Sequence, residues 1–111
     1  MAFTVNGIVW KLIFVSPNSR ELIRDNGTRT IGMTNGLTHT IYLANNLQGR
    51  MLDKVLSHEL THCLLFSYGI EIDQALEEKL ANWISIYGRE LVYLLDDLLS
   101  ILHRGASEWR A

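Results

Sequence analysis

The residues most able to do chemistry are His58, Glu59 and His62, which form the pattern His-Glu-x-x-His. Side chains four residues apart on a helix are neighbours, with Cβ atoms about 5–6 Å apart. Both imidazoles can therefore reach one zinc ion through bonds of roughly 2.0–2.1 Å. Glu59 then stands beside the metal, where a general base for a zinc-bound water is needed. The alternative is a buried helix whose histidines are satisfied by hydrogen bonds.

A catalytic zinc has three protein ligands and an open position for water, so the motif needs a third ligand. The next predicted helix carries two adjacent carboxylates, Glu77 and Glu78. Carboxylates this close repel each other, which raises one pKa unless a cation lies nearby. The sequence therefore predicts that one of this pair completes a metal site with His58 and His62.

Residues 78–84, Glu-Lys-Leu-Ala-Asn-Trp-Ile, together with the histidine motif, resemble the gluzincin branch of the zincin-like metallopeptidases. The closest likeness is to the small bacterial and phage relatives of the ImmA/IrrE family, and it covers residues 54–85 and a preceding hairpin. The resemblance implies a zincin-like fold, Zn²⁺ held by His58, His62 and Glu78, and peptide hydrolysis. It also implies that Asn82, one turn after Glu78, supports a ligand histidine. The family's longer C-terminal substrate region and its helix-turn-helix or sensor domains have no counterpart here.

Helical periodicity gives a different answer for the third ligand. Measured from Leu80 as the centre of the core face, Glu77 lies about 60° away and Glu78 about 160° away, which would turn Glu77 inward. However, the ligand helix must show one face to the core and another to the metal, and Asn82 lies one turn beyond Glu78 as a supporting partner. We favour Glu78 and keep Glu77 as the alternative.

The elements that position these residues follow from apolar periodicity. Residues 3–15 are apolar on both alternating faces, as in a buried central strand, with a turn at Asn6-Gly7. Residues 17–24 are predicted as a short helix that begins after Ser16. A hairpin is predicted over residues 28–34 and 38–43, with a type I′ turn at Asn35-Gly36. The first fifty residues therefore predict a small, mostly antiparallel sheet. The strand over residues 38–43 is expected at an edge of this sheet, where an extended peptide substrate could pair with it.

Three helices are predicted after the sheet. The active-site helix spans residues 50–67, with Asn45 or Asn46 as its cap. Asp73 caps a ligand helix over residues 74–87, which Gly88 kinks or ends. Residues 89–103 form a C-terminal helix. Its leucine stripe is interpreted as core, with contact between subunits of a homo-oligomer as the alternative.

The last residues are predicted as a loose tail that Trp109 could dock. The predicted fold class is α+β, as one domain over residues 1–111.

Composition limits the possible partners. The net charge of −2 argues against nucleic-acid binding, and the acidic residues gather in the second half, with ten in residues 51–111 against two in residues 1–50. No targeting segment or membrane-spanning run is found, and one cysteine makes no internal disulfide. We expect a cytoplasmic protein that acts on a peptide or protein substrate. The alternative is a catalytically silent zinc-containing interaction protein of a phage or mobile element.

Three other residues could ligate a metal but are given structural roles. Cys63 is rotated about 100° from His62 on the helix, so it is expected to be a small core residue. His39 is expected on the apolar strand face, with a place above the zinc as the alternative. His103 is expected to interact with the negative end of the last helix.

Overall fold

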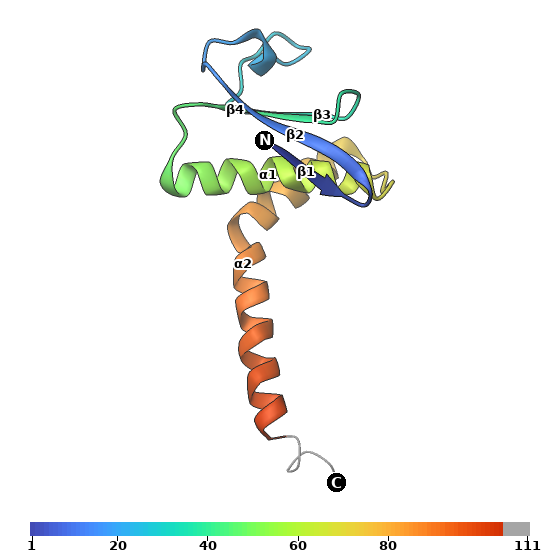
Figure 1. Ribbon diagram of the computed structural model, residues 1–111, viewed down its shortest axis with the longest axis vertical. Helices are drawn as coiled ribbons and strands as arrows, with labels where there is room; N and C mark the ends of the chain where they lie inside the picture. The colour runs from blue at the N-terminus through green and yellow to red at the C-terminus, as the bar shows by residue number, and fades with distance from the viewer. Residues whose placement is uncertain (106–111) are drawn as a thin grey trace.

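The computed structural model describes residues 1–105, and within them four strands form one sheet that is followed by two helices (Figure 1). Helix α1 lies against one face of the sheet, and the first part of α2 packs on α1. In chain order the elements are β1 (Ala2–Val5), β2 (Ile8–Val15), the 3₁₀ helix η1 (Arg20–Leu22), β3 (Gly32–Asn35), β4 (Thr40–Ala44), α1 (Gly49–Ser67) and α2 (Gln74–Arg104). The α+β class is as predicted. Neither helix in this part of the chain has the length and apolar character needed to cross a membrane.

The sheet is mixed, with the strand order β1-β2-β4-β3. Strands β1 and β2 form an antiparallel ribbon around Asn6-Gly7, where both residues have positive φ (49° and 76°), as the predicted turn requires. Strands β3 and β4 are also antiparallel, but β2 and β4 are parallel neighbours. The prediction of a mostly antiparallel sheet is therefore confirmed, whereas the parallel pairing of β2 with β4 had not been predicted.

The parallel pairing makes β4 an internal strand. The sequence had suggested that residues 38–43 form a free sheet edge where a peptide could add, and this is wrong because β4 is paired on both sides. The free edge on this side of the sheet belongs to β3.

The turn of the second hairpin also differs from the prediction. Asn35 still belongs to β3 and pairs with Thr40, so residues 36–39 form a four-residue loop. The side-chain oxygen of Asn35 accepts hydrogen bonds from the backbone N–H groups of Leu37 (2.9 Å) and Thr38 (3.2 Å). This Asx-type turn replaces the type I′ turn, and the positive φ falls on His39 (50°).

Strand β2 is central in the sheet but is covered on one face only. Trp10 and Leu12 point into the core, whereas Val9 and Ile13 on the other face are 60% and 38% exposed. The prediction of a strand buried on both faces is wrong because α1 packs against a single face. The core lies between this face and α1, and its buried residues are Trp10, Leu12, Ile41, Leu43 and Cys63.

The predicted helix over residues 17–24 is reduced to η1. The Ser16 hydroxyl accepts from the backbone N–H of Asn18, so the chain turns here before a helix can begin. Leu22 is fully buried and anchors the segment. This connection joins β2 to β3.

Helix α1 matches the predicted range to within one residue, but its N-cap residue is Gln48 rather than Asn45 or Asn46. The cap makes no side-chain hydrogen bond, and the Gln48 carbonyl accepts from the Leu52 N–H instead.

Helix α2 is one continuous helix of 31 residues, so the two helices predicted on either side of Gly88 are wrong. Asp73 caps it as expected and accepts from the Leu76 N–H. The interpretation of the leucine stripe as core is also wrong: Leu91, Leu94 and Leu98 are exposed, and the buried residue of α2 is Ala81.

The second half of α2 leaves the rest of the molecule. An ion pair between Arg89 and Asp53 of α1 lies where the two helices part. Beyond it, residues 89–104 extend away from the sheet and α1 (Figure 1). We call these residues the stalk and residues 1–88 the head. The predicted docking of Trp109 lies outside the described residues.

Candidate metal centre

Helix α1 brings His58 and His62 together on its face towards α2. Their Nε2 atoms lie 3.2 Å apart and the ring centroids 5.0 Å apart. Both side chains are mostly buried, with exposed fractions of 19% and 14%. This is the arrangement expected from the four-residue spacing on one helix.

Glu78, in the second turn of α2, faces both imidazoles. One carboxylate oxygen lies 3.3 Å from Nε2 of His58 and the other 3.1 Å from Nε2 of His62. A tetrahedral ion with bonds of roughly 2.0–2.1 Å keeps its ligand atoms about 3.3–3.4 Å apart. The three side chains therefore have the spacing that one small ion requires, and they could hold a metal ion.

Glu77 takes a different position from Glu78. Its carboxylate lies 2.5 Å from Nδ1 of His62, on the side of the ring away from Glu78. A carboxylate accepts from an N–H, so this contact assigns the ring proton to Nδ1 and leaves the Nε2 lone pair facing Glu78 and His58. Both predicted carboxylates therefore lie at the histidine pair: Glu78 faces both imidazoles, and Glu77 lies behind the ring of His62.

The position expected for Asn82, in contact with a candidate ligand histidine, is occupied by Glu77. Asn82 is exposed and lines a smaller cavity beside His58, and its backbone carbonyl accepts from the Ser85 hydroxyl. Within residues 1–105, the side chain that contacts the far nitrogen of a ligand histidine is that of Glu77. The helical periodicity had predicted that Glu77 is turned towards the interior, and this is confirmed, since its side chain is 29% exposed and that of Glu78 49%.

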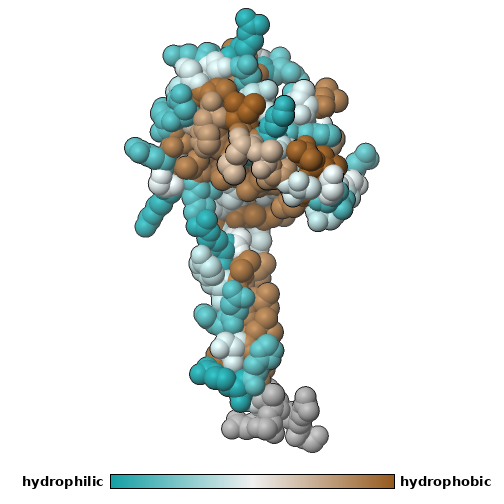
Figure 2. Space-filling model, viewed as in Figure 1, coloured by the Kyte–Doolittle hydropathy of each residue, from teal (hydrophilic) through white to brown (hydrophobic). Residues whose placement is uncertain are grey.

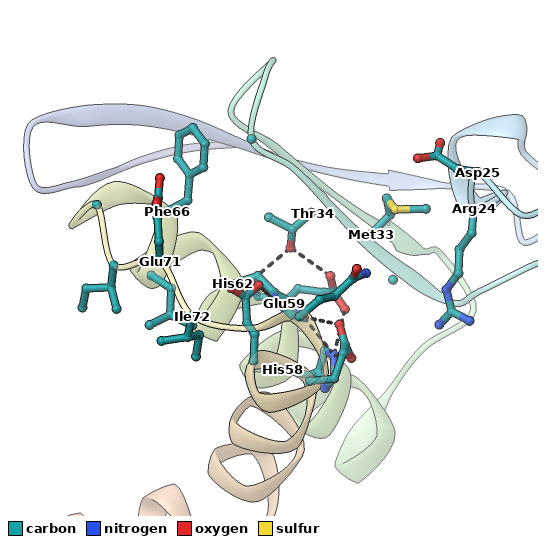
Figure 3. Close-up of a pocket in the computed structure, with 18 of the residues that line it drawn as sticks. Arg24, Asp25, Met33, Thr34, His58, Glu59, His62, Phe66, Glu71 and Ile72 are labelled. Carbon is teal, nitrogen blue, oxygen red and sulfur yellow. Dashed lines mark hydrogen bonds and ion pairs between the residues drawn. The ribbon is translucent and has the colours of Figure 1, made fainter.

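Glu59 is buried beside His58 and His62 (Figure 3). One carboxylate oxygen accepts from the Thr34 hydroxyl at 2.8 Å, and the other lies 3.9 Å from Nε2 of His58. Burial raises the pKa of the Glu59 carboxyl, and the Thr34 hydrogen bond partly opposes this shift. The carboxylate is fixed by β3 on one side and faces the histidines on the other.

An open cavity of about 1070 Å³ runs past these residues, between β3 and the first turns of α2. In Figure 3, Arg24 and Asp25 lie towards one end, and Phe66 and Ile72 towards the other. Residues from β3 form one wall: Gly32, Met33 and Thr34.

Several of these lining residues were missed by sequence reasoning. Thr34 lay on a predicted strand, but no local pattern showed that the strand would cross above Glu59. Arg24 and Glu71 lie in connections that carried no chemical motif.

The other candidate residues lie outside the ligand group. Cys63 is fully buried in the core, as expected, and burial raises the pKa of its thiol. His39 lies in the β3–β4 loop and packs on Trp10 and Phe66, with ring centroids 5.2 and 5.6 Å away. It does not line the cavity, so its alternative place above the metal is wrong. His103 is in the last turn of α2, as expected.

The donor set suits a divalent cation. The Nε2 atoms of the two imidazoles and the Glu78 carboxylate converge on one point. When both Nε2 atoms are unprotonated, these electron-rich atoms repel one another unless a positive charge lies between them. Imidazole and carboxylate ligands are compatible with zinc and with several other divalent metals.

Comparisons of the chain with protein-family models, with curated proteins and with solved structures gave no match.

Proposed function

We propose that this chain is a zinc-dependent peptide hydrolase of the zincin-like type, with Zn²⁺ held by His58, His62 and Glu78. The observation that supports this function best is the position of the buried Glu59 carboxylate beside the three potential ligands. A structural metal site has no need of an additional, uncoordinated carboxylate at this place. A hydrolytic site needs one to accept a proton.

A zinc ion bound there supplies Lewis-acid polarisation of a carbonyl and lowers the pKa of a bound water. Glu59 accepts a proton from the water that attacks the peptide carbonyl, and then donates it to the leaving amine. The Thr34 hydroxyl holds one oxygen of Glu59, which leaves the other free for this transfer. The raised pKa makes Glu59 a stronger proton acceptor than an ordinary carboxylate.

The free edge of β3 is our proposed binding site for the peptide backbone. Residues 32–34 lie along the cavity, and an extended peptide can pair with such an edge by main-chain hydrogen bonds. Thr34 belongs to the same strand and holds Glu59. A peptide on β3 would therefore pass directly over the proposed base.

The second candidate function is a zinc-containing interaction protein of a phage or mobile element that hydrolyses nothing. The exposed apolar side chains of the stalk favour this function, because large exposed apolar patches are typical of surfaces that bind another protein.

Replacement of Glu59 by Gln separates the two functions. The purified protein is assayed for bound metal by mass spectrometry and for cleavage of an unfolded protein and a fluorogenic peptide library. If the protein is a hydrolase, wild type and E59Q each bind one zinc ion. Wild type then cleaves the substrates, whereas E59Q has lost its turnover. Glu71→Gln is the matched control, since Glu71 lines the cavity away from the ligands and should keep its turnover. Full zinc with no cleavage by wild type would favour the second candidate, and no zinc at all would refute both.

A further inference from the structure

The stalk carries a large apolar surface with no partner in the described part of the chain. Its leucine, isoleucine and valine side chains are 41% to 60% exposed: Leu91, Val92, Leu94, Leu95, Leu98, Leu99, Ile101 and Leu102. Figure 2 shows hydrophobic surface along one side of the stalk and hydrophilic surface along the other. With standard side-chain areas they expose on the order of 700 Å² of apolar surface, which is more than monomeric proteins usually show in one patch.

The apolar positions follow a seven-residue repeat. Ile84, Leu91 and Leu98 occupy one repeating position, and Tyr87, Leu94 and Ile101 occupy the position three residues later. This is the a/d spacing of a coiled coil. Leu95, Leu99 and Leu102 widen the apolar arc to about 180° around the helix, given 3.6 residues per turn.

We propose that the stalk is a dimerisation element whose partner is the stalk of a second copy of this chain, packed antiparallel. The exposed apolar area is close to the roughly 800 Å² that each partner contributes to a stable interface. Two identical apolar faces are self-complementary, so a two-fold arrangement buries both at once.

The shape of the molecule selects the antiparallel arrangement. Packed helix axes lie about 8–10 Å apart, whereas the molecule is 30 × 28 Å across, and the stalk leaves the head beneath its middle (Figure 1). Parallel stalks would bring two heads to the same level. Antiparallel stalks place the heads at opposite ends of a paired segment of 16 residues, about 24 Å long.

The repeat also fixes the register of the pair. Packing of a positions against d positions places Leu91 against Ile101 of the second copy, and Leu94 against its Leu98. In this register Glu90 lies near Arg104 of the second copy, and the two-fold axis repeats this opposite-charge contact at the other end. The two Asp97 side chains lie near each other at the middle, on the solvent side.

The charges of the stalk argue against a membrane surface as its partner. Helices that lie on membranes usually carry Lys and Arg on the polar face. The polar face of the stalk has two arginines, Arg89 and Arg104, against three acidic residues, Glu90, Asp96 and Asp97. An anionic lipid surface would therefore not be attracted to it.

Analytical ultracentrifugation of the full chain tests the proposal. Wild type should be a dimer at micromolar concentration, and the double variant Leu94→Lys/Leu98→Lys should self-associate at least 100-fold more weakly. The matched control is Tyr93→Lys/Ser100→Lys, which adds the same charge on the polar face and should stay dimeric. Unchanged helical circular dichroism verifies that each variant is folded. A monomeric wild type would overturn the proposal, and a monomer that also sediments with vesicles of anionic lipid would replace it by membrane binding.

A charge exchange tests the register. Glu90→Arg should weaken the dimer, and Glu90→Arg/Arg104→Glu should restore it. Within one copy, or between parallel copies, these residues are 14 positions apart, about 21 Å along the helix, and cannot compensate for each other. Failure of the second change to restore the dimer would overturn the antiparallel pairing.

Discussion

The imidazole of His62 lies between two carboxylates of α2, with Nδ1 2.5 Å from Glu77 and Nε2 3.1 Å from Glu78. Two neighbouring residues of one helix therefore contact opposite sides of one ring. Glu78 also reaches His58, whereas Glu77 lies behind His62 and cannot share an ion with both histidines.

The two carboxylates should differ in their effect on metal affinity. Glu77→Gln should weaken zinc binding about 10–100-fold, as is usual when the partner of a ligand histidine is lost. Glu78→Gln removes a ligand and should weaken it further. Competition with a chromophoric chelator measures both, with Glu71→Gln as the control. A larger loss for Glu77→Gln than for Glu78→Gln would exchange their roles.

Removal of metal should destabilise the protein, because zinc bound to the folded state alone stabilises it. The gain is about 2.7 kcal/mol when the free metal is 100 times the dissociation constant. A chelator should therefore lower the Tm of wild type by several degrees in a thermal scan. His58→Ala, which lacks a ligand, should show no such shift. An equal shift in both proteins would mean that the chelator acts elsewhere.

Ionised Glu59 should reduce the stability of the metal-free protein. Burial raises the pKa of this carboxyl in the folded state above its unfolded value, so the fold favours the protonated form. Its stabilising contribution is present at pH values below the unfolded pKa and is lost as the pH rises through the folded pKa. Glu59→Gln stays neutral and should be more stable than wild type at about pH 8, with a smaller difference near pH 4.

Urea unfolding in the presence of a chelator checks this expectation at both pH values. Glu71→Gln, at an exposed position, should show little change in its free energy of unfolding. A Glu59→Gln protein that is less stable than wild type at the higher pH would contradict the expected cost of the buried charge.

Gly32 lies where β3 crosses α1, and it leaves no room for a side chain. A Cβ atom there would lie 2.7 Å from Val55 Cγ1 and 3.1 Å from Glu59 Cγ. Gly32→Ala should therefore cost about 1–3 kcal/mol, as overpacking usually does. Urea unfolding should show this loss.

A double-mutant cycle identifies the contact that causes the loss. Val55→Ala removes the nearer atom, so Gly32→Ala/Val55→Ala should be more stable than the sum of the two single changes predicts. Additive effects would show that Val55 is not the obstacle.

Much of the site could be predicted from the sequence, because helix spacing is local information. The positions of His58 and His62 follow from a four-residue spacing on one helix, and Glu78 was correctly separated from Glu77 as the residue that faces both. The contact of Thr34 with Glu59 could not be predicted, since it depends on which strand crosses α1. The mechanism and the zinc itself stay predictions.

The fold was predicted less completely, for two physical reasons. Alternation of apolar residues indicates strands but not their neighbours, so the parallel pairing of β2 with β4, and with it the free edge of β3, was missed. Periodicity likewise shows that a helix has an apolar face but not what covers it. Leu91 and Leu98 were therefore interpreted as core although they are half exposed.

The unbroken path of α2 through Gly88 has a thermodynamic consequence. The same helix carries Glu78 near its beginning and the stalk at its end. A metal ion bound by Glu78 and a second copy bound to the stalk would therefore contact one continuous helix. Any change in metal affinity caused by assembly must be matched by an equal change in assembly caused by metal, because linkage between two binding equilibria is reciprocal. The helix thus makes the metal a potential effector of the quaternary state.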